Sequence, residues 1–220
     1  MTTVESELRT LWRRLPGAAG HEHRLDALLL RLSEPHRRYH SATHVLWTCR
    51  HVTALARAGE LGELGPALLP PVLFAALYHD AIYRAGRTDL GTSPQTDEEL
   101  SAELARVTAL ELGWNSPASD LVARLVMATL AHSPADAPEA VLVDADLAVL
   151  GGSPAEYAAY LKGVRTEYAH VGDEAWRTGR SAVLRRFLDA PAIFHTATMR
   201  AERDARARAN LTAELATLSD

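Results

Sequence analysis

The sequence predicts an all-α protein, a single helical bundle, and three observations support that prediction. Apolar residues recur at spacings of three and four along nearly the whole chain, which is the period of an amphipathic helix. No segment alternates apolar and polar residues over enough positions to form a half-buried strand. Proline and glycine cluster between the periodic stretches, where helices are expected to end.

The periodic stretches predict a series of helices separated by short breaks. Their approximate ranges are 2–15, 23–33, 39–58, 68–82, 95–113, 117–131, 139–150, 154–169, 173–189 and 198–218. Ser153 is an expected N-cap, because Pro154 at the first helical position and the acidic Glu156 follow it. The longest break, about 83–95, is a candidate substrate lid.

Length and composition predict one cytoplasmic domain. The 220 residues can bury one sizeable core, so we expect a single domain over 1–220. A metal-binding core is expected at about 36–150, with the C-terminal helices 154–218 packing on it. The formal net charge of −5 argues against binding to duplex nucleic acid. We expect neither a membrane span nor a secretory signal, and a single cysteine excludes an internal disulfide.

The pair His79-Asp80 comes directly after an apolar run, residues 71–78, where the chain is otherwise entering a hydrophobic core. An imidazole and a carboxylate are costly to bury unless a partner compensates for the lost hydration. A divalent cation would compensate, because imidazole nitrogen and carboxylate oxygen both ligate first-row metals. His79 and Asp80 are therefore candidate metal ligands.

A third ligand is expected on the helix predicted for 39–58. At about 100° per residue, five side chains fall on one inward stripe. These are His40, His44, Trp47, His51 and Leu55. His44 lies in the middle of the stripe and is the expected ligand. The other two histidines are expected to be hydrogen-bonded groups of the core or of the site's surroundings.

Asp144 and Asp146 compete to supply a fourth ligand from the stretch 139–150. Two residues apart on a helix means about 200° around its axis, so both carboxylates cannot face the same ion. Asp146 falls inside a cluster of leucines and valines, where a carboxylate needs a partner. Asp144 points the opposite way and is expected to be solvated or to act as a helix-terminal charge. Asp146 is therefore the expected ligand.

Together, His44, His79, Asp80 and Asp146 offer two neutral nitrogens and two carboxylates, which neutralise one divalent ion. A six-coordinate ion would keep positions open for water and substrate, which is typical of a catalytic site rather than a closed structural one. The donor set suits Mn, Fe, Co, Ni or Mg, and it also accommodates Zn.

The order His…His-Asp…Asp on a helical chain resembles the HD superfamily of metal-dependent phosphohydrolases. More narrowly, the chain resembles a bacterial branch of predicted HD phosphohydrolases from about position 30 to the end. The segments that carry this resemblance are 34–44, 78–83, 97–102, 129–132, 144–151, 165–168 and 209–215. The resemblance implies that His44, His79, Asp80 and Asp146 hold the metal, and it leaves the substrate undefined.

The expected number of metal ions per chain rests on a difference between this sequence and the binuclear members of the superfamily. Those members, which include phosphodiesterases and di-iron oxygenases, carry two further histidines between the His-Asp pair and the last aspartate. Here His132 is the single histidine in that interval. We expect one ion per chain, although Glu98, Glu99 or His40 is available to complete a second site. His132 is a candidate for phosphate contact or proton transfer, or else a loop residue.

A phosphohydrolase needs a group that accepts the proton of the attacking water and positive groups that offset phosphoryl charge. The candidate catalytic residues are Asp80, Glu98, Glu99 and His132. The candidate substrate contacts are His40, Arg37, Arg38, Lys162 and Arg165.

The expected function is hydrolysis of a small phosphate ester or nucleotide by a metal-activated water. Two alternatives stay open, namely a di-iron oxygenase on the same scaffold and a non-catalytic metal- or nucleotide-binding regulatory module. The expected partner is a small phosphorylated substrate, with no duplex nucleic acid and no membrane. The helix predicted for 198–218 packs on the domain or on a second subunit, so a homo-oligomer is also open.

Overall fold

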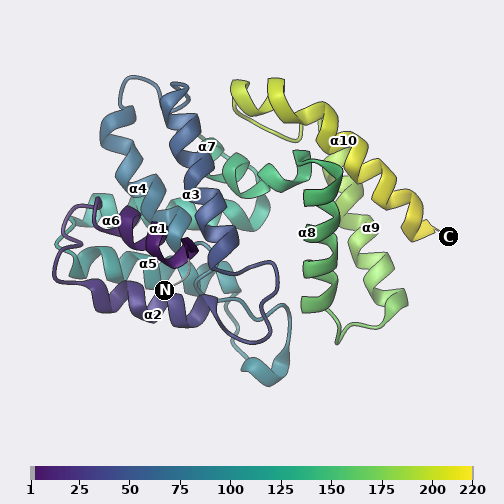
Figure 1. The fold of residues 1–220 in the computed structure, drawn as a ribbon, viewed down its shortest axis with the longest axis horizontal. Coiled ribbons are helices and arrows are strands. Elements are labelled where there is room, and N and C mark those ends of the chain that lie inside the picture. The colour runs from purple at the N-terminus through teal and green to yellow at the C-terminus, as the bar shows by residue number, and fades with distance from the viewer. Residues whose placement is uncertain (1–2, 220) are drawn as a thin grey trace.

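The computed structural model describes residues 3–219, which form ten α-helices, two short 3-10 helices and no strand (Figure 1). The all-α prediction is confirmed, while the expected helix start at residue 2 lies outside the described residues. No helix in this part of the chain is long and apolar enough to cross a membrane. The helices are α1 (Thr3–Trp12), α2 (Glu22–Leu32), α3 (Ala42–Arg57), α4 (Gly65–Tyr78), η1 (Thr88–Leu90), α5 (Asp97–Glu111), α6 (Ser116–Ala131), α7 (Ala137–Asp146), η2 (Leu147–Gly151), α8 (Pro154–Glu167), α9 (Asp173–Asp189) and α10 (Ala197–Ser219).

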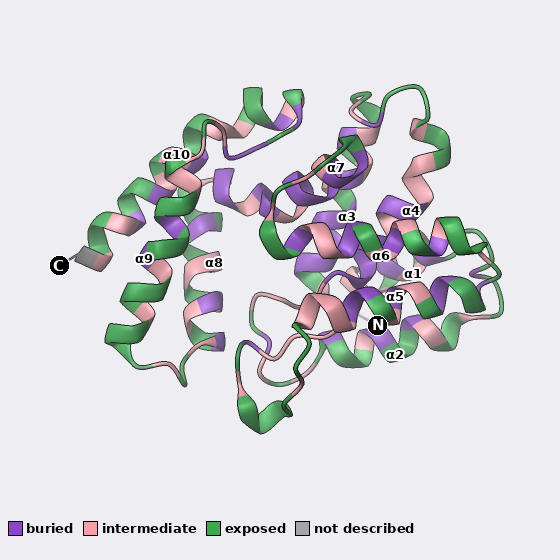
Figure 2. Cartoon of the chain, turned by 180° about the vertical axis from the view of Figure 1, so that it is seen from behind, coloured by how far each residue is buried: buried purple, intermediate pink, exposed green. Residues whose placement is uncertain are grey.

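The helices fall into two groups that lie side by side in Figure 1. Helices α1 to α7 form a body, and α8 to α10 form an arm. The body holds a group of aromatic rings in its core, where Trp12, Phe74 and Tyr78 are buried. Their ring centroids are 6.0 Å apart for Trp12 and Phe74 and 4.9 Å apart for Phe74 and Tyr78. Figure 2 shows buried positions throughout the body and many exposed positions on α9 and α10.

Gly151, at the end of η2, lets α10 pack closely on the connection between body and arm. A Cβ at this position would lie 2.5 Å from the Cβ of Arg203 and 2.8 Å from its carbonyl oxygen. Side chains do not tolerate such distances. The Asn210 amide donates to the carbonyls of Leu150 and Gly152, at 2.8 and 3.1 Å. The arm is therefore anchored on η2.

Asp144 provides a second anchor for the arm, on the face of α7 opposite Asp146. Its buried carboxylate accepts hydrogen bonds from the N–H of His195 at 2.9 Å and from the N–H and hydroxyl of Thr196 at 2.7 and 2.6 Å. The expectation that Asp144 is solvated is wrong. The helical period placed it correctly opposite Asp146, but the segment that leads into α10 covers that face.

Helix α3 begins at Ala42 instead of residue 39. The backbone N–H groups of residues 38–40 donate to the Glu167 side chain, so this stretch forms a turn. His40 therefore precedes the helix and does not share its stripe. Trp47, expected on an inward face, is 46% exposed at a cavity between α3 and the arm.

Candidate metal centre

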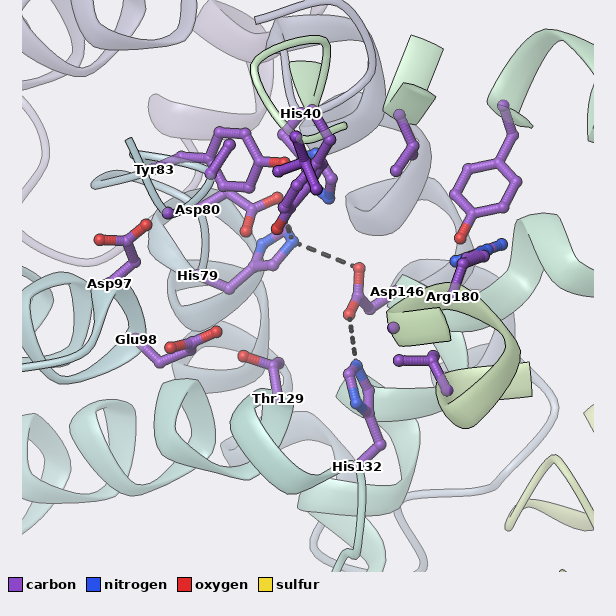
Figure 3. A pocket seen from close by; sticks show the side chains of 18 of the residues that line it. His40, His79, Asp80, Tyr83, Asp97, Glu98, Thr129, His132, Asp146 and Arg180 are labelled. Atoms are coloured by element: carbon purple, nitrogen blue, oxygen red, sulfur yellow. Dashed lines mark hydrogen bonds and ion pairs between the residues drawn. The ribbon is translucent and has the colours of Figure 1, made fainter. Parts of the chain in front are cut away.

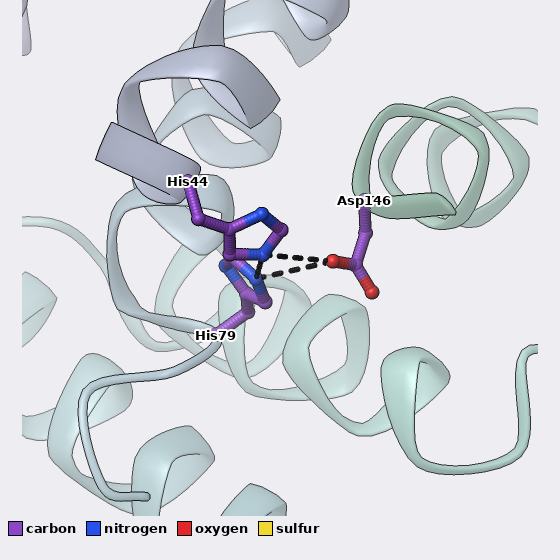
Figure 4. Close-up of side chains that lie close together, drawn as sticks. All are labelled: His44, His79 and Asp146. Atoms are coloured by element: carbon purple, nitrogen blue, oxygen red, sulfur yellow. Dashed lines mark hydrogen bonds and ion pairs between the residues drawn. The ribbon is translucent and has the colours of Figure 1, made fainter. Parts of the chain in front are cut away.

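Three elements bring the expected ligands together. His44 lies on α3, and Asp146 is the last residue of α7. His79 and Asp80 directly follow α4, which ends at Tyr78 and not at residue 82 as expected. His79 caps α4 with helical dihedral angles (φ −55°, ψ −35°), and its Nε2 lies 3.1 Å from Asp80 Oδ2, so the two side chains face one region. Figure 4 shows the rings of His44 and His79 with the Asp146 carboxylate pointing toward them.

The ligand atoms form a compact group. His44 Nε2 lies 3.1 Å from His79 Nε2 and 3.0 Å from Asp146 Oδ1, and His79 Nε2 lies 3.4 Å from the same oxygen. Asp80 Oδ2 approaches the His44 and His79 nitrogens at 3.3 and 3.1 Å. Ligand atoms that bind one ion at about 2.1 Å, with angles of about 90–109°, stand about 3.0–3.4 Å apart. The observed spacings fit a single divalent cation.

Asp80 Oδ2 supports the same conclusion. It is shielded from solvent and has no hydrogen-bond partner among the described residues. A buried carboxylate oxygen is costly in that state, and a cation would satisfy it. His44, His79 and Asp146 form the tightest group and can hold a metal ion, while Asp80 contacts both histidines of that group.

His79 is prepared as a ligand by its other ring nitrogen. His79 Nδ1 lies 2.9 Å from the carbonyl oxygen of Ala76. Because a carbonyl oxygen only accepts hydrogen bonds, Nδ1 carries the proton and Nε2 presents its lone pair. The ring is thereby held in the tautomer and orientation that metal binding requires.

Arg37 holds the turn that carries the His-Asp pair. Its buried guanidinium donates to the carbonyl oxygens of Asp80 at 2.7 Å, Ala81 at 3.2 Å and His40 at 3.1 Å. Arg37 Nε also donates a hydrogen bond to the Glu34 carboxylate, at 3.0 Å. Arg37, a candidate substrate contact, thus contacts the backbone of the metal site and is not among the residues that line the cavity beside it.

The carboxylates and imidazoles shift one another's pKa values. Burial by itself lowers the pKa of His44 and His79, but Asp80 and Asp146 outweigh burial and hold both values above the ordinary range. Burial likewise raises the pKa of each aspartate, and the neighbouring histidines outweigh it and hold both values well below normal. Both carboxylates are therefore charged at neutral pH, and a cation competes with protons for the histidine nitrogens.

His132 contacts Asp146 from the other side. It ends α6 with φ 51° and ψ 39°, in the left-handed region, which costs about 1–2 kcal/mol for a residue other than glycine. This conformation brings its Nε2 to 3.3 Å from Asp146 Oδ2. Its Nδ1 is buried without a partner among the described residues. Asp146 thus contacts His132 with one oxygen and the two ligand histidines with the other.

Glu167, the last residue of α8, belongs to the site, and sequence reasoning missed it. Its Oε1 accepts the N–H groups of residues 38, 39 and 40 at 2.7, 2.8 and 3.0 Å. Its Oε2 accepts hydrogen bonds from His40 Nδ1 at 2.7 Å and the Tyr83 hydroxyl at 3.0 Å. Burial by itself would raise the pKa of Glu167, but His40 and the backbone donors lower it to about 2. Its one signal in the sequence is its place in the segment 165–168.

A cavity of about 570 Å³ lies beside the metal ligands, lined by residues of both body and arm (Figure 3). The candidate residues that line it are His40, His79, Asp80, Glu98, His132 and Asp146. The segment predicted as a lid contributes Tyr83, Ala85 and Gly86 to the wall. Most of the expected catalytic residues therefore face one cavity.

Five further candidates do not line this cavity, and two of them, His44 and Arg38, line the other cavity, between α3 and the arm. The Glu99 carboxylate accepts the N–H of Thr96 and caps α5. Lys162 is exposed on α8, and Arg165 bonds within the turn that follows α8. The cavity instead contains Arg180 from α9, which the sequence analysis did not select. An arginine carries little signal in a chain whose cationic residues are nearly all arginine.

No family model, curated protein or solved structure matches this chain.

Proposed function

We propose that this chain is an HD-type metal-dependent phosphohydrolase that acts on a small phosphate ester or nucleotide, with one divalent cation per chain. The proposal is carried by one observation: two histidines and two aspartates converge at spacings that suit a single ion. The donor set suits Mn, Fe, Co, Ni, Mg or Zn.

A divalent cation bound there supplies Lewis acidity for the phosphoryl group and for an attacking water. The chain's own residues hold the ligands ready for it. The Ala76 carbonyl orients His79, and Arg37 fixes the turn that carries Asp80. His132 contacts Asp146 on the oxygen that faces away from the other histidines. Because these contacts already exist, binding needs little rearrangement of the ligands.

Glu98 is the residue that we assign to accept the proton of the attacking water. It lies in the first turn of α5 and lines the same cavity as Asp80. Its carboxylate forms no ion pair within the described part of the chain, whereas Glu99 is engaged as a cap. A carboxylate that is free beside the metal ligands can serve as a general base.

The cavity matches a small substrate. Its volume of about 570 Å³ is typical of pockets that enclose small molecules. The net charge of −5 gives the chain no excess of cations with which to neutralise a nucleic-acid backbone. A small phosphorylated compound is therefore the favoured partner.

Metal reconstitution tests the proposal. The protein is stripped with a chelator, loaded with each candidate ion, analysed for ions per chain, and assayed for phosphate release from phosphoesters and nucleotides. We expect turnover in at least one loaded form, and a loss of about a hundredfold or more in Asp146→Asn. Glu103→Gln, on the exposed face of α5, is the matched control and should keep its activity.

Two outcomes would contradict the proposal. One is a folded protein that binds one ion and releases no phosphate from any ester. The other is a protein with two irons per chain that consumes oxygen, which would replace the proposal with the di-iron oxygenase.

A further inference from the structure

Arg180 is the sole arginine or lysine among the described residues that line the cavity beside the metal ligands. It comes from α9, and its side chain is only 9% exposed. Its Nε and Nη2 donate to the two carboxylate oxygens of Glu214 on α10, at 2.7 and 3.0 Å. The hydroxyl of Tyr157 donates to the same carboxylate.

This network fixes a guanidinium inside the cavity. Glu214 takes two of its five N–H donors, and the guanidinium also lies 5.3 Å from the centroid of the Tyr160 ring. Burying an ion pair seldom adds stability compared with apolar packing, so its presence here calls for another role. A guanidinium held in one orientation is well suited to bind phosphoryl oxygens.

Arg180 lies at one end of the cavity, and the two acidic residues of α5, Asp97 and Glu98, lie at the other. Figure 3 shows Asp97 and Glu98 on one side of the metal-ligand group and Arg180 on the other, past Asp146. Arg180 also shares a second, smaller cavity with Asp146 and His132. An anion placed between the metal ligands and Arg180 would meet the bound cation on one side and, on the other, the guanidinium N–H donors that Glu214 leaves free.

The acidic end of the cavity would repel further negative charge. Asp97 is neutralised by Arg84, whose Nε lies 2.5 Å from its Oδ1. Glu98 has no such partner within the described residues. A second phosphate at this end would face the Glu98 carboxylate in a partly desolvated space, where repulsion between like charges is strong.

Aromatic side chains from both groups of helices line the remaining wall. Tyr83 comes from the segment after the His-Asp pair, Tyr168 from the end of α8 and Trp176 from α9. The rings of Tyr168 and Trp176 have centroids 5.6 Å apart. Such a wall favours a flat aromatic group over a flexible aliphatic chain.

We propose that the cavity selects a phosphate monoester whose remainder is aromatic and carries no second negative charge, with Arg180 binding the phosphoryl oxygens. The substrate class rests on the proposed phosphohydrolase activity. Arg180 is assigned as a substrate-binding residue, and Glu98 also determines specificity by excluding a second phosphate.

Phosphonates test this substrate class because they are not hydrolysed. Three probes are titrated by calorimetry into the metal-loaded protein: phenylphosphonate, methylphosphonate, which lacks the ring, and 1,4-phenylenediphosphonate, which adds a second anion. We expect phenylphosphonate to bind about tenfold more tightly than either of the others. Equal affinity for phenylphosphonate and the diphosphonate would overturn the proposal, and so would an absence of binding by the folded, metal-loaded protein.

Two variants locate the contacts. Arg180→Gln combined with Glu214→Gln keeps a neutral hydrogen-bonded pair and should weaken phenylphosphonate binding about tenfold. Arg185→Gln, exposed on the same helix, is the control and should bind normally. If the double variant does not fold, Arg180→Lys is used instead. It keeps the ion pair with Glu214 but removes the planar guanidinium with its parallel N–H donors, and it should also weaken phenylphosphonate binding. Unchanged affinity in a folded Arg180 variant would overturn the assignment.

A Glu98 variant tests the assigned role in specificity, and the binding and hydrolysis results together distinguish the two proposals. Glu98→Gln should reduce the difference in affinity between phenylphosphonate and the diphosphonate. Glu103→Gln is the matched control. If the phosphonates bind as expected and no ester is hydrolysed, the proposed function fails and the ligand class stands. If esters are hydrolysed and polyphosphates are preferred, the function stands and the ligand class fails.

Discussion

The two faces of α7 place similar carboxylates in opposite situations. Asp144 and Asp146 are two residues apart and neither is freely solvated. Asp144 accepts hydrogen bonds from the backbone and hydroxyl at the start of α10. Asp146 faces histidine nitrogens from three other parts of the body. One carboxylate is satisfied by the protein itself, and the other lies where a cation can bind.

The same distinction separates the other acidic residues near the site. Glu167 and Glu99 are satisfied by backbone N–H groups and hold turns or helix ends in place. Asp80, like Asp146, faces the ligand histidines, and its buried Oδ2 has no hydrogen-bond donor among the described residues. The donors around a buried carboxylate, more than its burial, therefore indicate whether it is structural or a metal ligand.

The largest expected effect lies on the metal-binding face. Asp146→Asn should weaken metal affinity by about a hundredfold or more, since it removes a charged ligand from the compact group. Titration calorimetry with Mn²⁺ measures the change. Asp144→Asn is the control and should bind the ion as the wild type does. The reverse result would show that the two faces have been assigned the wrong way round.

A second large effect concerns the pH dependence of stability through Glu167. Its folded pKa of about 2 lies below the ordinary value of 4.5, so between these values the unfolded chain binds more protons than the folded one. The stabilisation is complete above about pH 4.5 and is lost as the pH falls toward 2. We expect a loss of about 2–3 kcal/mol over this window.

Urea unfolding at a series of pH values tests this expectation. Glu167→Gln should be less stable at pH 7 and should show a flatter dependence between pH 4.5 and 2. A variant curve that stays parallel to the wild type would show that Glu167 does not carry the effect.

A smaller effect is expected on the structural face of α7. Asp144→Asn places an amide N–H₂ against N–H donors and should lower the free energy of unfolding by about 2 kcal/mol. Chemical denaturation measures this loss. Asp189→Asn, exposed at the end of α9, should change stability by no more than about 0.5 kcal/mol. An equally stable Asp144→Asn would mean that its hydrogen bonds do not anchor the arm.

The smallest effect is expected at Glu99. Glu99→Ala removes half of the capping box with Thr96 and should cost about 1 kcal/mol, which lowers the melting temperature by about 2–4 °C. Metal affinity should stay unchanged, because Glu99 does not line the cavity. A loss of metal binding would place Glu99 in the site instead.

Local features of the sequence determined much of the fold and the metal group. The N-cap expected at Ser153 is confirmed, and the structure adds a reciprocal bond from the Glu156 side chain, because these donors and acceptors lie within one turn. The helical period likewise separated Asp146 from Asp144 correctly. His44, His79 and Asp80 could be selected because residues costly to bury stood among apolar ones.

Tertiary structure decided what covers each face. Asp144 is buried by a segment about fifty positions away, and Glu167 reaches a turn still farther back in the chain. The same holds for Arg180, which is distinguished from the other arginines by its place in the cavity. Periodicity reports which side of a helix a residue occupies, since it depends on a few neighbouring residues. It does not report which distant segment packs there, because that depends on how the whole chain buries its apolar surface.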